Sequence, residues 1–158
     1  MKKVSFADMQ CSVAQALEVI GEWWTLLILR DAFLGVTRFD DFANRLGIAR
    51  NVLTARLDTL VENDVLVRVP YDETRGRYDY RLTDKGRALL PVMTAIRQWG
   101  DAWILGKEHA PVVVEHTTCG AISTGILTCH QCGGELTTKN VRARPGPGAS
   151  DDSLLPRS

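Results

Sequence analysis

Two short helical patterns joined by a single glycine dominate residues 37–63. In the first, apolar residues recur at the spacing of one helix face: Phe39, Phe42, Ala43 and Leu46. Thr37 and Asp40 have the spacing of a capping box, which predicts a helix start near Arg38, and Gly47 supplies the left-handed stop. A second helix over residues 49–63 buries its own apolar stripe: Val52, Leu53, Leu57, Leu60 and Val61. Two helices joined this tightly indicate a helix-turn-helix.

The polar side of the second helix is the candidate recognition surface. Arg50, Asn51 and Thr54 lie mostly off the apolar stripe, and such side chains can read base edges in the major groove of DNA. Arg56 is a candidate phosphate contact if its side chain reaches around the helix. The sequence therefore favours DNA binding by this helix pair.

A β-hairpin is predicted after the second helix. Residues 66–69 and 78–82 alternate with the period of two expected of strands, and residues 72–77 form the turn. Gly76 lies between Arg75 and Arg77 at the tip, where guanidinium groups can meet DNA phosphates or the minor groove. Hairpin tips are also often charged for solubility alone. The preceding helix pair favours the DNA interpretation, so we predict a winged helix-turn-helix in a mainly helical α+β chain.

Over residues 11–105 the sequence resembles the HxlR family of bacterial winged-helix transcription regulators. The distinctive segments are the helix from Trp24 to Arg30, the turn from Gly35 to Phe39, LTARL at Leu53 to Leu57 and LTDKG at Leu82 to Gly86. The resemblance implies a homodimer that binds double-stranded operator DNA, and a repressor, since the family mostly blocks promoters. The family commonly has Ser or Thr where this chain has Ala49, and the missing side-chain cap costs the recognition helix about 1 kcal/mol.

Helices are also expected on both sides of this module. Ser12 and Gln15 have capping-box spacing, which predicts a helix over residues 13–20, and Gly21 separates it from a second helix over residues 22–34.

On the C-terminal side, Thr83 can cap a long helix that runs to about Leu105, with a kink at Pro91. Its apolar strip indicates a dimer interface shared with the N-terminal helix: Leu89, Val92, Met93, Ile96, Trp99, Trp103 and Ile104. For any single residue of the strip, ordinary core is the alternative. A two-fold dimer predicts that the operator is an inverted repeat.

Cys11 is a candidate redox sensor. It stands just before Ser12, where the positive end of a helix dipole stabilises a thiolate. Some members of the HxlR family sense oxidants or electrophiles through a cysteine at the corresponding place. The alternative is a small buried residue that packs beneath the dimer helices. No small-molecule effector is identified by the sequence.

Beyond Gly106 the chain repeats one short pattern, a metal ligand followed by two residues, a cysteine and a glycine. The ligands are His116 and Cys119 in the first copy, and Cys129 and Cys132 in the second. This spacing predicts one tetrahedral Zn²⁺ in a small zinc-ribbon-like β unit over residues 112–142, where structural zinc can contribute roughly 10 kcal/mol or more. Extended members of the HxlR family carry a similar cysteine-containing addition. The alternatives are a redox dithiol, His130 in place of His116, and a remnant that binds nothing.

Composition limits the remaining classes. A chain of 158 residues has room for one winged-helix domain, here residues 1–106, the small unit, and a tail over residues 143–158 that we expect to be disordered. No apolar stretch reaches the length of a membrane span and residues 1–10 lack a signal-peptide core, so we expect a cytoplasmic protein. Motifs for nucleotide, phosphate or catalytic zinc sites are missing, and an enzyme is not expected.

The net charge is unusual for a DNA-binding chain. It is zero overall, and the stretch from Gly35 to Arg81 contains eight arginines and eight acidic residues. Binding then requires that the arginines gather on one surface, and we expect a shallow salt dependence. The alternative function is a winged-helix module that binds a partner protein and no specific DNA.

Overall fold

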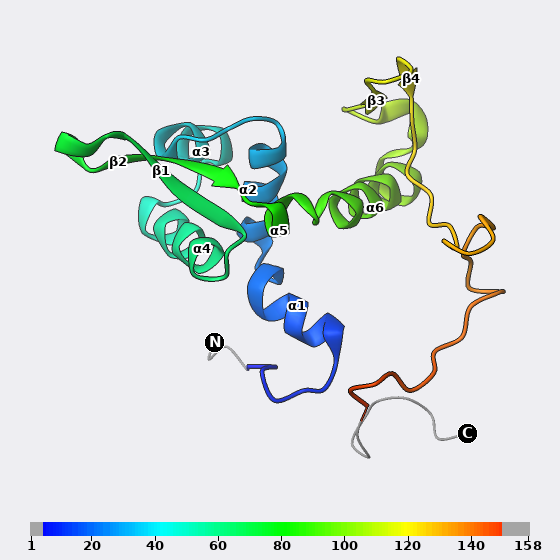
Figure 1. Ribbon diagram of the computed structural model, residues 1–158. Coiled ribbons are helices and arrows are strands. Elements are labelled where there is room, and N and C mark those ends of the chain that lie inside the picture. The colour runs from blue at the N-terminus through cyan, green and yellow to red at the C-terminus, as the bar shows by residue number, and fades with distance from the viewer. Residues whose placement is uncertain (1–4, 150–158) are drawn as a thin grey trace. The chain divides into compact units, whose positions relative to one another are not determined.

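The computed structural model describes residues 5–149, which divide into two compact units: residues 5–89 with 145–149, and residues 90–144. The predicted tail over residues 143–158 lies outside the described residues from position 150 onward. The first unit contains, in chain order, α1 (Ser12–Ile20), α2 (Trp23–Phe33), α3 (Phe39–Leu46), α4 (Arg50–Glu62), β1 (Leu66–Asp72), β2 (Arg77–Leu82) and α5 (Asp84–Arg87) (Figure 1).

The core of the first unit lies between α2, α3, α4 and the base of the hairpin. Its fully buried apolar side chains come from the positions that helical periodicity selects: Ile28, Leu29, Phe42, Leu53, Leu57 and Leu60. Val65 and Leu66 close the core at the start of β1. The burial of Leu53, Leu57 and Leu60 leaves the opposite side of α4 turned to solvent. The predicted orientation of the second helix is therefore confirmed.

A buried carboxylate ties α2 to α3. Asp31 is fully buried, and its oxygens pair with Arg30 at 2.9 Å and with Arg45 of α3 at 3.3 Å. Both arginines remain about half exposed, at 48% and 51%. This ion pair fixes the first helix of the helix-turn-helix against the preceding one, a contact that periodicity alone does not reveal.

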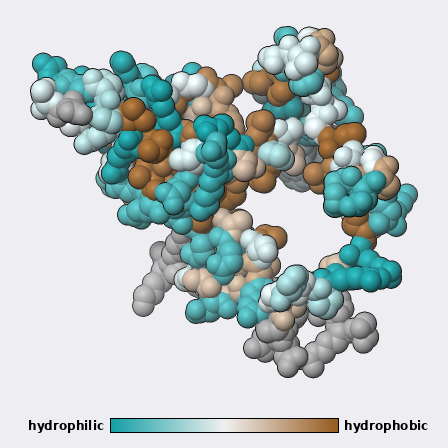
Figure 2. Space-filling view, viewed as in Figure 1, coloured by the Kyte–Doolittle hydropathy of each residue, from teal (hydrophilic) through white to brown (hydrophobic). Residues whose placement is uncertain are grey.

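The hairpin pairs β1 with β2 in antiparallel register from Leu66–Leu82 to Asp72–Arg77, and it projects beyond α3 and α4 (Figure 1). A 3₁₀ turn over Glu73–Arg75 and Gly76 at φ +59° form the tip, as the sequence predicts. Hydrophilic residues cover this tip (Figure 2).

The predicted capping box at Thr37 and Asp40 is wrong. Arg38 is the N-cap of α3 and has no side-chain cap, because Thr37 is held by β2 instead. The carbonyl of Thr37 accepts a bond from the Tyr80 N–H at 2.7 Å, and its hydroxyl donates to Asp79 at 3.3 Å. The chain before α3 is thus joined to the two-stranded hairpin by an isolated β-bridge between Arg38 and Asp79.

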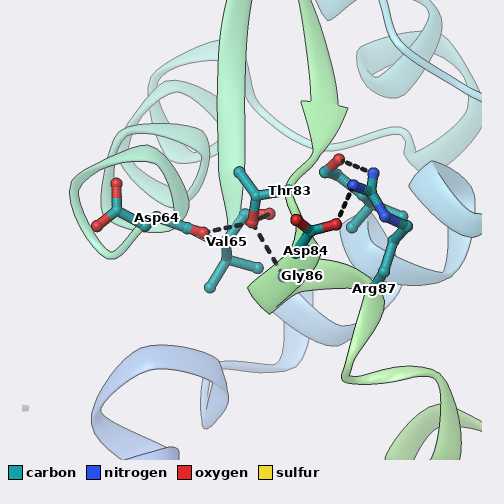
Figure 3. Close-up of polar contacts among 7 residues, drawn as sticks. Asp64, Val65, Thr83, Asp84, Gly86 and Arg87 are labelled. Atoms are coloured by element: carbon teal, nitrogen blue, oxygen red, sulfur yellow. Dashed lines mark hydrogen bonds and ion pairs between the residues drawn. The ribbon is translucent and has the colours of Figure 1, made fainter.

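Thr83 caps α5 as predicted and also fastens the base of the hairpin (Figure 3). Its Oγ1 accepts a bond from the Gly86 N–H at 3.0 Å and donates to the Asp64 carbonyl at 2.5 Å. Arg87 donates to the Leu82 carbonyl at 2.6 Å. These bonds fix the end of β2 against the turn that follows α4.

Two further predictions about helix ends are wrong. Cys11, not Ser12, is the N-cap of α1, and the Gln15 amide donates to carbonyls of the preceding segment, including Ala7 at 2.9 Å. The helix predicted from Thr83 to Leu105 is divided at Ala88 and Leu89, before the helix that contains Pro91 at its second position, and it changes to a π-helical turn after Gly100. Pro91 has no N–H to continue the hydrogen-bond ladder.

The second unit contains α6 (Leu90–Gly100), a π-helical turn (Asp101–Leu105), a 3₁₀ turn (Lys107–His109), β3 (Glu115–His116) and β4 (Ala121–Ile122). Arg97 of α6 pairs with the buried Asp101 at 2.7 Å and donates to the Val112 carbonyl at 3.3 Å. Gln98 and Gly125 exchange two hydrogen bonds, of 2.8 and 2.6 Å. The C-terminal segment is thus attached to α6 by polar contacts.

Within residues 5–149, a membrane-spanning helix would need more length and apolar character than any single helix has. Only α1 and α2 taken together meet that test, and they are bent by 77° relative to each other.

Candidate nucleic-acid interface

An open groove of about 640 Å³ lies between the start of α4, the start of α3 and the hairpin. It brings together the sequence-predicted residues Arg50, Asn51, Thr54 and Arg77. The other lining residues come mainly from α3 and the two strands: Arg38, Phe39, Asp40, Asp41, Tyr71, Gly76, Tyr78 and Tyr80. Cationic, amide, hydroxyl and aromatic groups on one open surface match what a nucleic acid offers, namely phosphates and base edges.

Arg50 is held in position at the first turn of α4. Its Nη1 lies 2.9 Å from Asp40 Oδ1, and its guanidinium lies 4.7 Å from the centre of the Phe39 ring. The side chain nevertheless remains 69% exposed, so it can still reach a ligand. Asn51 and Thr54 are exposed beside it, and Ala49 provides no side-chain cap, as expected.

The hairpin side of the groove contains Arg77 at the start of β2, next to Gly76. Arg75 lies at the hairpin tip outside the groove lining, 70% exposed and 3.8 Å from Asp72. The two predicted wing arginines therefore occupy different places, one in the groove and one at its outer edge.

Sequence reasoning missed Arg38 and Tyr71. The Arg38 guanidinium lies 4.7 Å from the centre of the Tyr71 ring and 3.9 Å from Asp79, which directs it into the groove. No local pattern marks this pair, because Arg38 precedes α3 and Tyr71 lies on β1. Only the pairing of residue 38 with β2 brings them together.

Arg56 lies elsewhere. Its side chain is 25% exposed and its Nη1 lies 3.6 Å from Glu22 Oε1 at the start of α2, and Arg56 is not among the groove residues. In this arrangement Arg56 connects α4 to α2 and does not reach around the helix toward the groove.

The stretch from Gly35 to Arg81 has no net side-chain charge, yet its ion pairs leave some arginines on the groove. Seven of the eight arginines between Gly35 and Arg81 form ion pairs, and Arg77 has none with the described side chains. Arg45 and Arg56 pair with α2, whereas Arg38, Arg50 and Arg77 face the groove. The stretch has no excess of arginines over acidic residues, but three of its arginines lie together on the groove.

The cysteines fall in both units. Cys11 is half-buried at the N-cap of α1. In the second unit, His116 Nδ1 lies 3.3 Å from Cys119 Sγ. The backbone N–H groups of Cys132 and Gln131, together with the Cys132 side chain, lower the pKa of the Cys129 thiol. Within residues 5–149, groups of three or more potential metal ligands are absent, so the two pairs stand apart.

Comparison with known proteins identifies the family of the chain. Residues 19–108 match the family described as HxlR-like helix-turn-helix. An uncharacterized HTH-type transcriptional regulator of Mycobacterium tuberculosis is 47% identical over 137 residues, which cover 87% of this chain and 87% of that protein.

Solved structures extend the comparison. The crystal structure of PA1607, a candidate transcription factor, has a TM-score of 0.79 and 40% identity over 90% of this chain and 100% of that one. The redox regulator HypR in its reduced form has a TM-score of 0.54 and 28% identity over 58% of this chain and 92% of that one. Because the family match covers more than half of the chain and the Mycobacterium tuberculosis relative is 47% identical over 87% of it, the chain belongs to the HxlR-like helix-turn-helix family and is a DNA-binding transcriptional regulator.

Proposed function

We propose that the chain acts as a homodimeric repressor whose two grooves bind the half-sites of an inverted-repeat operator. In each protomer, Arg50, Asn51 and Thr54 would reach base edges, and Arg75 and Arg77 would meet the DNA backbone or minor groove. One observation carries this assignment, the groove that joins the exposed start of α4 to the hairpin. Repression follows if the operator overlaps a promoter, because the bound dimer then excludes polymerase.

Exposed apolar side chains support the dimer. No residue of α6 is buried, and its exposed large residues include Ile96 at 47% and Trp99 at 60%. Trp103 in the π-helical turn is 78% exposed, and Val13 of α1 is 66% exposed. A monomer rarely leaves so many large apolar groups in water, whereas a second copy would cover them. Two-fold symmetry would then place the recognition helices about one DNA turn, or a multiple of it, apart.

The test is binding to the DNA upstream of the chain's own gene, compared with unrelated DNA of equal length. We expect sequence-specific binding that a double variant, Arg50→Ala with Arg77→Ala, weakens at least about a hundredfold, since each contact is worth about 1–3 kcal/mol. The control variant, Lys139→Ala with Arg142→Ala, removes the same charge from the second unit and should bind normally. Equal binding to both DNAs would instead favour a protein-interaction module.

We also propose that thiol oxidation releases the operator. Cys11 is the one cysteine of the first unit and lies at the N-cap of α1, ahead of the matched residues 19–108, and HypR is a redox regulator. A hydroperoxide would oxidise the Cys11 thiolate to a sulfenic acid and would itself be reduced to an alcohol or water. A change at the start of α1 would reach the DNA through the dimer surface that we assign to this helix.

Replacement of Cys11 by Ser tests this regulation. Operator release by a hydroperoxide, followed by fluorescence anisotropy, should disappear in Cys11→Ser and persist in Cys119→Ser. Unchanged release in Cys11→Ser would remove this residue from the mechanism.

A further inference from the structure

We propose that His116, Cys119, Cys129 and Cys132 together bind one Zn²⁺, and that this ion closes the C-terminal part of the second unit. Such a site belongs to the second unit, whereas the groove belongs to the first, and it goes beyond the proposed repressor function. Four observations support it: the geometry of the two turns, the spacing of the first ligand pair, the attachment of the connecting segment, and the lack of a core.

The two ligand pairs lie in turns of the same backbone geometry. In the first turn the Gly120 N–H donates to the His116 carbonyl at 2.8 Å, and in the second the Gly133 N–H donates to the Cys129 carbonyl at 2.7 Å. Gly120 and Gly133 have φ of +70° and +72°, which favours glycine over residues with a Cβ. Each turn therefore folds the chain back between its two candidate ligands in the same way.

The first pair already has nearly the spacing that zinc requires. His116 Nδ1 lies 3.3 Å from Cys119 Sγ. Zn–N and Zn–S bonds of about 2.1 and 2.3 Å at a tetrahedral angle place the two ligand atoms about 3.6 Å apart. His130, the other candidate histidine, instead contacts Gln131 at 3.0 Å through its Nε2. The structure thus favours His116 as the nitrogen ligand.

The first turn is closed by a short ladder and the second by a single β-bridge. His116 ends β3, which pairs with β4, and Thr128 forms a bridge with Glu135 around the second turn. Between them, Gly125 exchanges two hydrogen bonds with Gln98 of α6. The segment that connects the two turns is therefore hydrogen-bonded to α6 through Gly125, which lies about midway between them.

This part of the unit has no apolar core. From residue 111 to residue 144, the end of the second unit, every residue is exposed except Cys129, which is half-buried. Ordering a segment costs conformational entropy that the burial of apolar side chains normally offsets. A structural metal ion is the usual substitute in units of this size, because its ligands cross-link the chain.

The four ligands do not yet converge, since within residues 5–149 no three potential ligands form one group. The proposal is therefore that Zn²⁺ draws the second turn onto the first. On binding, the three cysteine thiols lose their protons to solvent and become thiolate ligands.

The experiment measures metal content and ligand type in the full chain. Protein purified under reducing conditions and then dialysed against Zn²⁺ should retain one equivalent per chain. Replacement by Co²⁺ should give the strong thiolate-to-cobalt charge-transfer absorption and the visible bands of a tetrahedral site with three sulfur ligands. This spectrum reports the ligands of the unaltered chain, so it does not depend on whether a variant folds.

Variants then test the ligand set. Cys119→Ser and Cys132→Ser should each lower zinc retention at least tenfold, and His116→Ala should do so as well. Cys11→Ser and His130→Ala are matched controls that should keep the full equivalent. DNA binding by each variant reports separately on the first unit, so failure of the metal site and failure of the proposed repressor function are distinguishable.

Three outcomes would overturn the proposal. The first is less than about a tenth of an equivalent of zinc in the unaltered chain, given the affinity of structural sites. The second is full retention in Cys119→Ser, which would mean that the two turns do not share an ion. The third is a Cys129–Cys132 disulfide that forms as readily with Zn²⁺ present as without it.

Discussion

Arg50 illustrates how single residues tune a groove that has little net charge. Its ion pair with Asp40 and its contact with Phe39 restrict its rotamers, while 69% of the side chain remains exposed. Asp40 is itself 71% exposed and lines the same groove, so it also repels phosphates. We therefore expect this one carboxylate both to position Arg50, which we propose reads bases, and to weaken binding to any duplex.

Asp40→Asn should therefore bind all DNA more tightly and distinguish sequences less well. We expect affinity for unrelated duplex to rise about two- to fivefold, in line with the energy of up to about 1 kcal/mol for an exposed ion pair, and affinity for the operator to rise less. Glu115→Gln, which removes an exposed acid from β3, is the control. Unchanged affinity for unrelated DNA would show that Asp40 does not act on the groove.

Gly86 is required by a close approach at the base of the hairpin. A Cβ at this position would lie 2.2 Å from the Val65 carbonyl oxygen, which is backbone and cannot move alone (Figure 3). We expect Gly86→Ala to lower the free energy of unfolding by about 2 kcal/mol or more, as overpacked sites do. Gly100→Ala is the matched control, because nothing lies within 4 Å of its Cβ. Equal stability of the two variants in denaturant unfolding would contradict this account.

At the scale of elements, Asp31 holds α2 and α3 together. Asp31→Ala leaves Arg45 without its carboxylate partner. Breaking a fully buried pair costs roughly 3–5 kcal/mol, and since both arginines are about half exposed we expect a lower loss, about 2 kcal/mol. Asp84→Ala, which breaks the exposed pair with Arg87, should change stability by less than about 1 kcal/mol. Urea unfolding of both variants measures the difference, and losses of the same size would show that burial of Asp31 adds nothing.

Periodicity predicted the elements that bury one face. The helix over residues 49–63 is found as α4, Arg50–Glu62, and the strands and glycine turns are close to their expected places. Predictions that depended on which side chain bonds to which backbone group were less successful. Thr37 and Ser12 had the right spacing for caps, but tertiary partners, β2 and the segment before α1, determined where the hydrogen bonds formed.

The site shows the same division. Arg50, Asn51 and Thr54 could be predicted because they lie opposite an apolar stripe on one helix. Arg38 enters the groove only through its pairing with β2, and Arg56 turns toward Glu22. Contacts between segments that are distant in the sequence leave no local pattern. The residues that α4 contributes to the groove were therefore predicted better than those from the segment before α3.

At the scale of the whole molecule, we expect the small number of arginines on the binding surface to limit how strongly DNA affinity depends on salt concentration. Four arginines per protomer face the groove or the hairpin tip: Arg38, Arg50, Arg75 and Arg77. A dimer then makes at most about eight phosphate contacts, and each contributes about −0.9 to the slope of log affinity against log salt. We expect a slope no steeper than about −7. A slope of −9 or beyond, roughly ten contacts, would contradict this charge distribution.

Removal of one arginine tests the dimer in the same measurement. Arg77→Ala removes one contact from each protomer, so a bound dimer should lose about 1.8 from the magnitude of its slope, whereas a bound monomer should lose about 0.9. Arg142→Ala removes an equal charge from the second unit and should leave the slope unchanged. Because the change in slope counts phosphate contacts in the complex, a loss near 0.9 would contradict binding as a dimer even if the chain forms dimers in free solution.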